Sequence, residues 1–172
     1  MIGTFKYTIM YVSLFSSMSN VKLSKMKNKK LFEKTVNILV KAYKNGTLKH
    51  QLCQACAVGN IIAYFNPEIK RIGDLPCSDY VWFDVVMSFR QLKRDYDSEN
   101  YDRGLKHIRQ TSYSIADIST IEQSFERADK GDSEESYMFN GLMSVVDCLM
   151  IIHEANETET IYAKSLFVKE TA

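Results

Sequence analysis

The chain has 172 residues, of which 45% are hydrophobic and 25% are charged. This length fits one domain with a substantial core, and this composition excludes a chain that is disordered throughout. The formal net charge of +1 creates no global field that attracts nucleic acid or acidic lipid, and seven glycines with two prolines are too few for an all-β fold.

The first 25 residues differ from the rest of the chain. The apolar stretch over residues 7–15 is much shorter than a membrane span. A signal peptide carries its positive charge before the apolar stretch, whereas here the lysines cluster after it, so a signal peptide is the weaker alternative. We therefore expect residues 1–25 to be a leader or a flexible N-terminal extension, and residues 26–172 to form a single helical domain.

Hydrophobic periodicity predicts two helices in the first third of this domain. The first covers residues 29–45, and Gly46 follows it directly, at the position where a left-handed residue ends a helix. The second covers residues 51–65, and Asn66-Pro67 ends it. It carries small residues that we expect to pack closely against the long helix over residues 134–154, namely Ala57, Gly59 and Ala63.

The middle of the chain predicts three more helices. A helix over residues 79–94 is apolar around much of its circumference, so we expect it to be central. A short helix covers about residues 105–110. Ser114 and Asp117 have the spacing of a capping box for a helix over residues 115–128.

The strongest periodicity lies over residues 134–154, where apolar residues recur at alternating steps of three and four, and Asp132 or Ser133 would cap that helix. A last short helix contains Ile161 and Leu166. The sequence thus predicts an all-α protein, an irregular or orthogonal bundle of six or seven helices, with the helices at about 79–94 and 134–154 in its centre.

The chain contains one candidate metal site. Cys53 and Cys56 have the two-residue gap that lets two thiolates hold one zinc ion, and His50 lies just before them. A fourth ligand would come from His153, Cys148 or Cys77. A strong zinc pattern has a second close pair, which is missing here, so we favour reduced, buried cysteines in a cytoplasmic protein and keep zinc as the alternative cofactor.

A second alternative is a small-molecule binder or enzyme. Its pocket would lie between the second, third and sixth predicted helices and would be lined by Asn60, Tyr64, Trp82 and Asp147. The polar side of the 134–154 helix, formed by Asn140, Ser144 and Asp147, needs partners if buried, and Asn60 or Tyr64 could supply them. The sequence has no glycine-rich phosphate loop, nucleophile elbow or kinase signature, so we assign no catalytic residue.

Several segments together resemble a group of small uncharacterised proteins from Bacteroidetes bacteria and their phages. They are Cys53-Gln-Ala-Cys56-Ala-Val-Gly59-Asn60-Ile-Ile-Ala63, Trp82, Ile118-x-x-Ile-Glu-x-x-Phe125-Glu and Met138-Phe-Asn-Gly-Leu-Met-x-Val-Val-Asp147. The similarity runs from about residue 26 to the end. That group has no assigned activity, so the resemblance implies a cytoplasmic setting and a phage origin but no residue roles.

We therefore expect a non-enzymatic helical protein that acts by protein–protein binding or self-association, such as a phage-encoded modulator of a host protein, with no nucleic-acid partner and no membrane span. Eight methionines, ten tyrosines and nine phenylalanines provide adaptable apolar surface for a partner.

Overall fold

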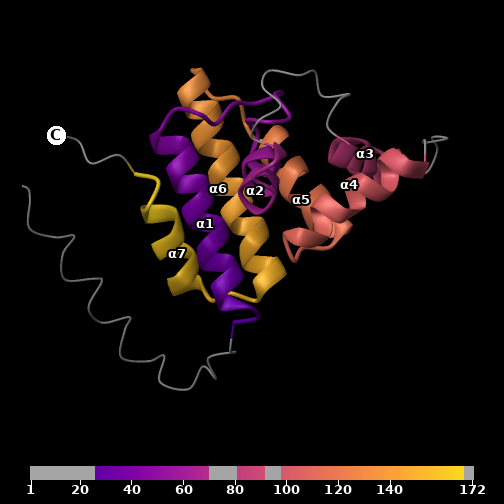
Figure 1. Ribbon diagram of the computed structural model, residues 1–172. Helices are drawn as coiled ribbons and strands as arrows, with labels where there is room; N and C mark the ends of the chain where they lie inside the picture. The colour runs from indigo at the N-terminus through magenta and orange to yellow at the C-terminus, as the bar shows by residue number, and fades with distance from the viewer. Residues whose placement is uncertain (1–25, 70–80, 92–97, 169–172) are drawn as a thin grey trace, which may run out of the picture.

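The computed structural model describes residues 26–69, 81–91 and 98–168, and this part of the chain is all-α, as predicted. The expected leader, residues 1–25, lies outside the described residues. The described helices are α1 (Lys29–Lys44), α2 (Ala57–Phe65), α3 (Val81–Gln91), α4 (Ser98–Gln110), α5 (Ile115–Glu126), α6 (Glu134–His153) and α7 (Glu157–Ser165). Figure 1 shows α1 and α6 side by side, α7 on their outer side, and α3 with α4 at the opposite end of the molecule.

The core is one continuous cluster of apolar side chains drawn from all seven helices. Its largest fully buried members include Leu39 of α1, Ile61 of α2, Trp82 of α3, Phe125 of α5 and Leu149 of α6. Burial of one such side chain stabilises the fold by about 1.5–3 kcal/mol, so the cluster is the main source of stability.

Three helix ends agree with the sequence. Gly46 follows α1 with φ of +67°, in the left-handed region. Ser114 and Asp117 form a reciprocal capping box at the start of α5, and Ser133 caps α6 by accepting the Ser136 N–H. These signals involve only neighbouring residues, which is why the sequence alone reveals them.

The predicted start of the second helix is wrong, because α2 begins at Ala57 rather than at residue 51. Gln51 has φ of +60°, which interrupts any helix there. Residues 50–56 instead form turns in which Lys49 N–H donates to Ala55 O and Cys56 N–H donates to Leu52 O. Cys56 then caps α2, its Sγ accepting the Gly59 N–H at 3.3 Å.

The expected partner of α2 is also wrong, since α2 packs mainly against α1, α4 and α5 rather than against α6. Gly59 does permit a close approach, but to the loop before its own helix: a Cβ there would lie 1.8 Å from the Cys53 carbonyl oxygen. Close helix packing through glycine occurs at Gly104 of α4, where a Cβ would lie 2.3 Å from Val81 O of α3.

The α3–α4 pair therefore differs from the prediction in two ways. α4 begins at Ser98, well before the expected residue 105, because Gly104 lets this largely polar helix pack along α3. α3 contacts mainly α4 and α5, so it is less central than expected, and Phe89 is half exposed. Residues 79, 80 and 92–94 of the predicted helix lie outside the described residues.

α6 is long and apolar enough to cross a membrane by length and composition. A core helix of a soluble protein passes the same test. In this fold the α6 side chains Leu142, Val145, Val146 and Leu149 are completely buried, and the helix packs against α1, α5 and α7. These buried side chains of α6 are therefore covered by other helices of the same protein.

Candidate functional site

His50, a predicted metal ligand, lies between two aromatic rings. Its imidazole stacks on Phe125 at a centroid distance of 4.0 Å and on Tyr137 at 3.5 Å. Nδ1 lies 3.3 Å from a carboxylate oxygen of Glu126, and Nε2 lies 3.2 Å from the backbone oxygen of Tyr137. When the ring is protonated, both nitrogens donate to these oxygens, so neither nitrogen is open to a metal ion.

The Glu126 carboxylate also accepts the Gln51 N–H at 3.1 Å, and Tyr137 Oη donates to Glu126 O at 2.8 Å. Burial raises the pKa of Glu126, whereas the Gln51 N–H and His50 act in the opposite direction. This set of contacts joins the loop before α2 to the end of α5 and the start of α6. We call His50, Phe125, Glu126 and Tyr137 the histidine clamp.

The cysteines of the CxxC pattern are engaged within the protein. Cys56 is buried and free, and its Sγ donates to Cys53 O while accepting the Gly59 N–H. Burial raises the pKa of the Cys56 thiol to about 12, so it is protonated at neutral pH. Cys53 is disulfide-bonded, in contrast to the reduced state expected from the sequence. Cys148 is also buried and free, and Cys77 lies outside the described residues.

The remaining predicted ligand, His153, belongs to a buried hydrogen-bonded chain. Its Nδ1 donates to Lys27 O at 3.0 Å, and its Nε2 accepts from Tyr113 Oη at 2.9 Å, which contacts Thr35 Oγ1 at 2.8 Å. Lys27 N–H donates back to His153 O at 2.7 Å. Among the described residues, no three His, Cys, Asp or Glu side chains are arranged to hold a metal ion.

The buried position of His153 makes a prediction about pH. Burial lowers the pKa of His153 below its ordinary value of 6.5, although the Lys27 carbonyl opposes this shift. The unfolded chain therefore takes up the proton at a higher pH than the folded chain. The stabilisation is complete above about pH 6.5 and decreases as the pH falls below that value, by at most about 1.4 kcal/mol per pH unit for one proton.

Urea unfolding at several pH values should show this loss, and His153→Gln should reduce the slope. Burial also lowers the pKa of His107, which contributes with the same sign, so the difference between the two proteins isolates His153. NMR titration of the histidine ring protons provides a direct check. A pKa at or above 6.5 for His153 in the folded protein would contradict the prediction.

The four residues proposed to line a pocket have separate surroundings. Trp82 is 1% exposed in the core, and the Asn60 amide donates to Ala55 O and Cys56 O. Tyr64 is 45% exposed, with the Lys34 ammonium 5.4 Å from its ring centroid. Asp147 pairs with Lys164 of α7 at 2.6 Å. The structure therefore does not bring these four side chains to one cavity.

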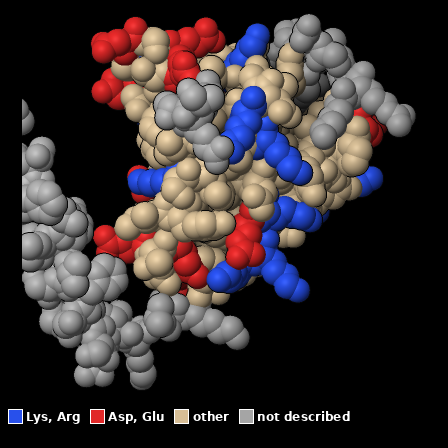
Figure 2. All heavy atoms as spheres, turned by 90° about the vertical axis from the view of Figure 1, so that its left-hand side faces the viewer, with Lys and Arg blue, Asp and Glu red and all other residues tan. Residues whose placement is uncertain are grey.

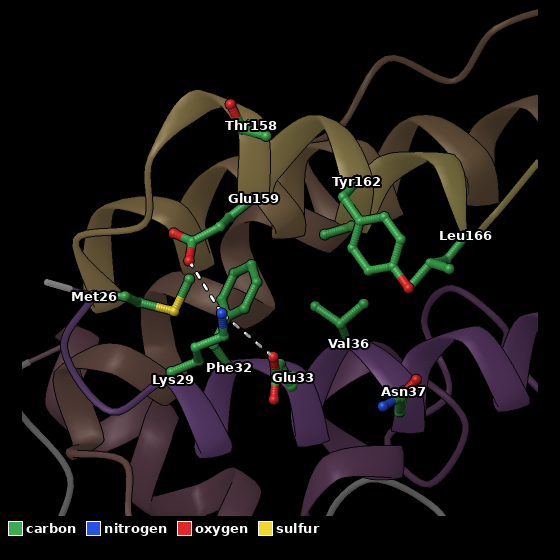
Figure 3. A pocket seen from close by; sticks show the side chains of 11 residues that line it. Met26, Lys29, Phe32, Glu33, Val36, Asn37, Thr158, Glu159, Tyr162 and Leu166 are labelled. Atoms are coloured by element: carbon green, nitrogen blue, oxygen red, sulfur yellow. Dashed lines mark ion pairs between the residues drawn. The ribbon is translucent and has the colours of Figure 1, made fainter. Parts of the chain in front are cut away.

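A groove of about 450 Å³ lies between α1 and α7, as Figure 3 shows. Phe32 and Val36 of α1 and Ala163 of α7 form its floor, and each is at most 3% exposed. Leu166 lies at one end and Met26 at the other (Figure 3). Tyr162 stands at the rim with 66% of its surface exposed.

Charged side chains lie at the Met26 end of the groove. Lys29 Nζ is 3.5 Å from Glu159 Oε1 and 3.9 Å from Glu33 Oε1, which leaves one negative charge in excess among the three groups. Glu159 is fixed in place, since its other oxygen accepts the Asn156 N–H in a capping box. Figure 2 views this side of the molecule and shows uncharged surface bordered by acidic and basic side chains.

Sequence reasoning missed this groove because its two walls lie more than 120 residues apart in the chain. One local signal existed: Asn156 and Glu159 have capping-box spacing, which marks the start of α7. The apolar residues in and just after α7 differ in burial, since Phe167 is completely buried whereas Ile161 is exposed. Comparisons with protein-family models, curated proteins and solved structures found no match to this chain.

Proposed function

We propose that this is a non-enzymatic protein that binds another protein through the groove between α1 and α7. The observation that supports this proposal is the combination of a fully apolar floor with an exposed aromatic ring at its edge. Tyrosine is one of the residue types that contribute most to protein–protein binding when a partner buries them. Ile161 of α7 and Val168 after it are also exposed apolar side chains.

The chemistry of the groove suits a particular kind of partner. Its apolar floor suits aliphatic or aromatic side chains, whose burial would supply most of the affinity. Glu33 and Glu159 compete for the single cation of Lys29, so a lysine or arginine of the partner would find a carboxylate at this end. The partner would therefore be an apolar peptide segment with a basic residue at one end. A phage-encoded modulator of a host protein would bind in this way.

Photo-crosslinking tests the proposal in the full chain. A benzoylphenylalanine in place of Tyr162 should give an adduct with a second protein. The same substitution at Tyr64 is the matched control, since that tyrosine is also exposed but lies outside the groove. Glu33→Lys should reduce the adduct several-fold, because it replaces an attractive charge by a repulsive one.

The crosslinked protein can then be purified and titrated against the full chain. Tyr162→Asp should weaken its binding at least about tenfold, because a charge would face the apolar segment, and Tyr64→Asp should leave it unchanged. Three results would each overturn the proposed function. They are equal yields of adduct from positions 162 and 64, no adduct from either position, and an affinity that Tyr162→Asp leaves unchanged. An adduct of twice the chain mass would identify the partner as a second copy.

A further inference from the structure

We propose that α1 and Tyr64 of α2 form a second binding surface, which takes a single strand of nucleic acid. The surface is independent of the proposed function, because it lies on a different side of α1 from the groove. The net charge of the whole chain favours no nucleic-acid partner, but that number averages over an uneven distribution. Residues 26–49 contain seven lysines and one acidic residue, Glu33, which gives this segment a formal charge of +6. Such local asymmetry is typical of proteins that bind a polyanion.

Exposed lysines recur along one side of α1. They are separated by four, seven and three residues and are Lys30, Lys34, Lys41 and Lys44. At about 100° per residue they lie within about 80° of one another around the helix, and they extend over about 21 Å along its axis. Among the described residues none of the four forms an ion pair, whereas the neighbouring Lys29 does. We call these four residues the lysine row.

The lysine row borders a hollow of about 580 Å³ on the surface of α1. Lys30, Lys34 and Lys41 line this hollow, and so does Tyr64, which has 45% of its surface exposed. The Lys34 ammonium lies 5.4 Å from the centroid of the Tyr64 ring, so a cation and an aromatic ring are presented together. Asn37 lines both this hollow and the groove between α1 and α7, so the two hollows are neighbours.

The exposure of the lysine row favours a nucleic acid over an acidic protein segment. An exposed lysine gains little from a single carboxylate, because water and salt screen both charges. A nucleic-acid strand carries condensed counterions, and each phosphate that a lysine neutralises releases them into solution. The row therefore binds consecutive phosphates more effectively than it binds separate acidic side chains. All four residues are lysines, which act as point charges and suit phosphates without a fixed orientation.

The Tyr64 ring favours a single strand. Proteins that bind single strands combine a row of positive charges with aromatic side chains on which bases stack. In a duplex the bases are paired and stacked on one another, so an aromatic ring outside the helix has no base to contact. An anionic membrane also attracts lysines, but it offers no planar group to a ring that lines a hollow. Phosphates on the lysine row would place a base beside Tyr64.

Binding of a labelled oligonucleotide to the full chain tests the inference. The probe is a fluorescein-labelled oligothymidylate of about 12 nucleotides, within the roughly 4–16 nucleotides that a single-strand site of one domain covers, and its anisotropy reports binding. Each phosphate contact contributes about −0.7 to the slope of log affinity against log salt concentration, so the lysine row should give about −3. Lys34→Glu with Lys41→Glu should weaken binding at least about tenfold and bring the slope to about −1.5.

Lys106→Glu with Lys130→Glu is the matched control. It changes the net charge equally, at two exposed lysines outside the lysine row and its hollow, so it should leave the affinity and the salt slope nearly unchanged. Lys30→Gln with Lys44→Gln removes the other half of the row without adding acidic groups, and it should also weaken binding several-fold. Circular dichroism of each variant shows whether the helices are kept.

Tyr64→Ala separates stacking from charge. It should weaken binding at least about fivefold, the lower end for loss of one base–aromatic stack, because one base loses its contact. It should leave the salt slope unchanged, since no phosphate contact is lost. Tyr64→Phe keeps the aromatic ring and should bind like the wild type.

Failure of the oligonucleotide to bind at about 50 mM salt would overturn the inference, as would equal loss of affinity in the two double variants with glutamate. Displacement of the probe by oligoglutamate of the same charge and concentration would overturn it in favour of an acidic protein segment. Displacement by phosphatidylserine vesicles, but not by phosphatidylcholine vesicles, would overturn it in favour of a membrane surface. None of these results affects the proposed function, whose readouts are an adduct with a second protein and the affinity for that protein.

Discussion

Gly59→Ala should destabilise the protein by about 3 kcal/mol or more, among the largest effects expected of a single methyl group. The added Cβ would lie 1.8 Å from Cys53 O and less than 3 Å from two further backbone carbons. A flexible side chain could move aside, but these atoms belong to the turns whose hydrogen bonds position Cys56 as the cap of α2. Relief of the overlap therefore requires displacement of the loop, the helix or both.

Urea unfolding followed by circular dichroism and by the fluorescence of Trp82, the single tryptophan, measures this effect. Gly46→Ala is the matched control. Nothing lies within 4 Å of a Cβ at Gly46, so this variant bears only the strain of a left-handed alanine, about 1 kcal/mol. Equal loss of stability in the two variants would show that the close approach at Gly59 does not constrain the fold.

The elements that sequence analysis placed correctly are those determined by neighbouring residues. The predicted helices over 29–45, 115–128 and 134–154 agree with α1, α5 and α6 to within about two residues. In each, a strong apolar periodicity coincides with a local end signal: Gly46 after α1, the Ser114 box before α5 and Ser133 before α6. Periodicity and capping act over one or two helical turns, so they can be recognised without the fold.

The elements that it misplaced depend on contacts between distant residues. His50 was considered a metal ligand because of two nearby cysteines, but its partners are Glu126 and Tyr137, 76 and 87 residues further along the chain. Those contacts form the loop that shortens α2. A spacing of three between cysteines fits a metal site, a buried helical face or a helix cap equally well, and only the tertiary structure distinguishes the three.

The groove illustrates the same limit for function. Phe32 and Val36 looked like ordinary core positions of a periodic helix, and they are buried as expected. Their second role, as part of the floor of the groove, depends on how α7 lies beside α1. That position is set by the turn after α6, where Glu154 has φ of 55°, and by the Lys164–Asp147 ion pair. None of these features follows from the local pattern of α1, so a binding surface there could not be predicted.

His50→Ala should cost about 3 kcal/mol, because the histidine clamp loses several interactions at once. The ring stacks on Phe125 and on Tyr137 with interplanar angles of 9° and 4°, and each aromatic contact contributes about 0.5–1.5 kcal/mol beyond the burial of its area. The substitution also removes one of the partners of Glu126, whose side chain is 18% exposed, and leaves the Gln51 N–H as the other. Since burial already raises the pKa of that carboxyl group, loss of His50 should raise it further.

A double-mutant cycle separates the ion pair from the stack. Glu126→Gln removes the buried charge, so it should recover about 1 kcal/mol or more of the stability lost in His50→Ala, measured by urea unfolding. Lys49→Ala is the control for the loop, because this neighbouring side chain is exposed and its loss should change stability by less than about 0.5 kcal/mol. Strict additivity of the His50 and Glu126 substitutions would show that the two side chains are not energetically coupled. In that case the stacking of His50 and its hydrogen bond to Tyr137 O would account for its contribution to stability, without the ion pair.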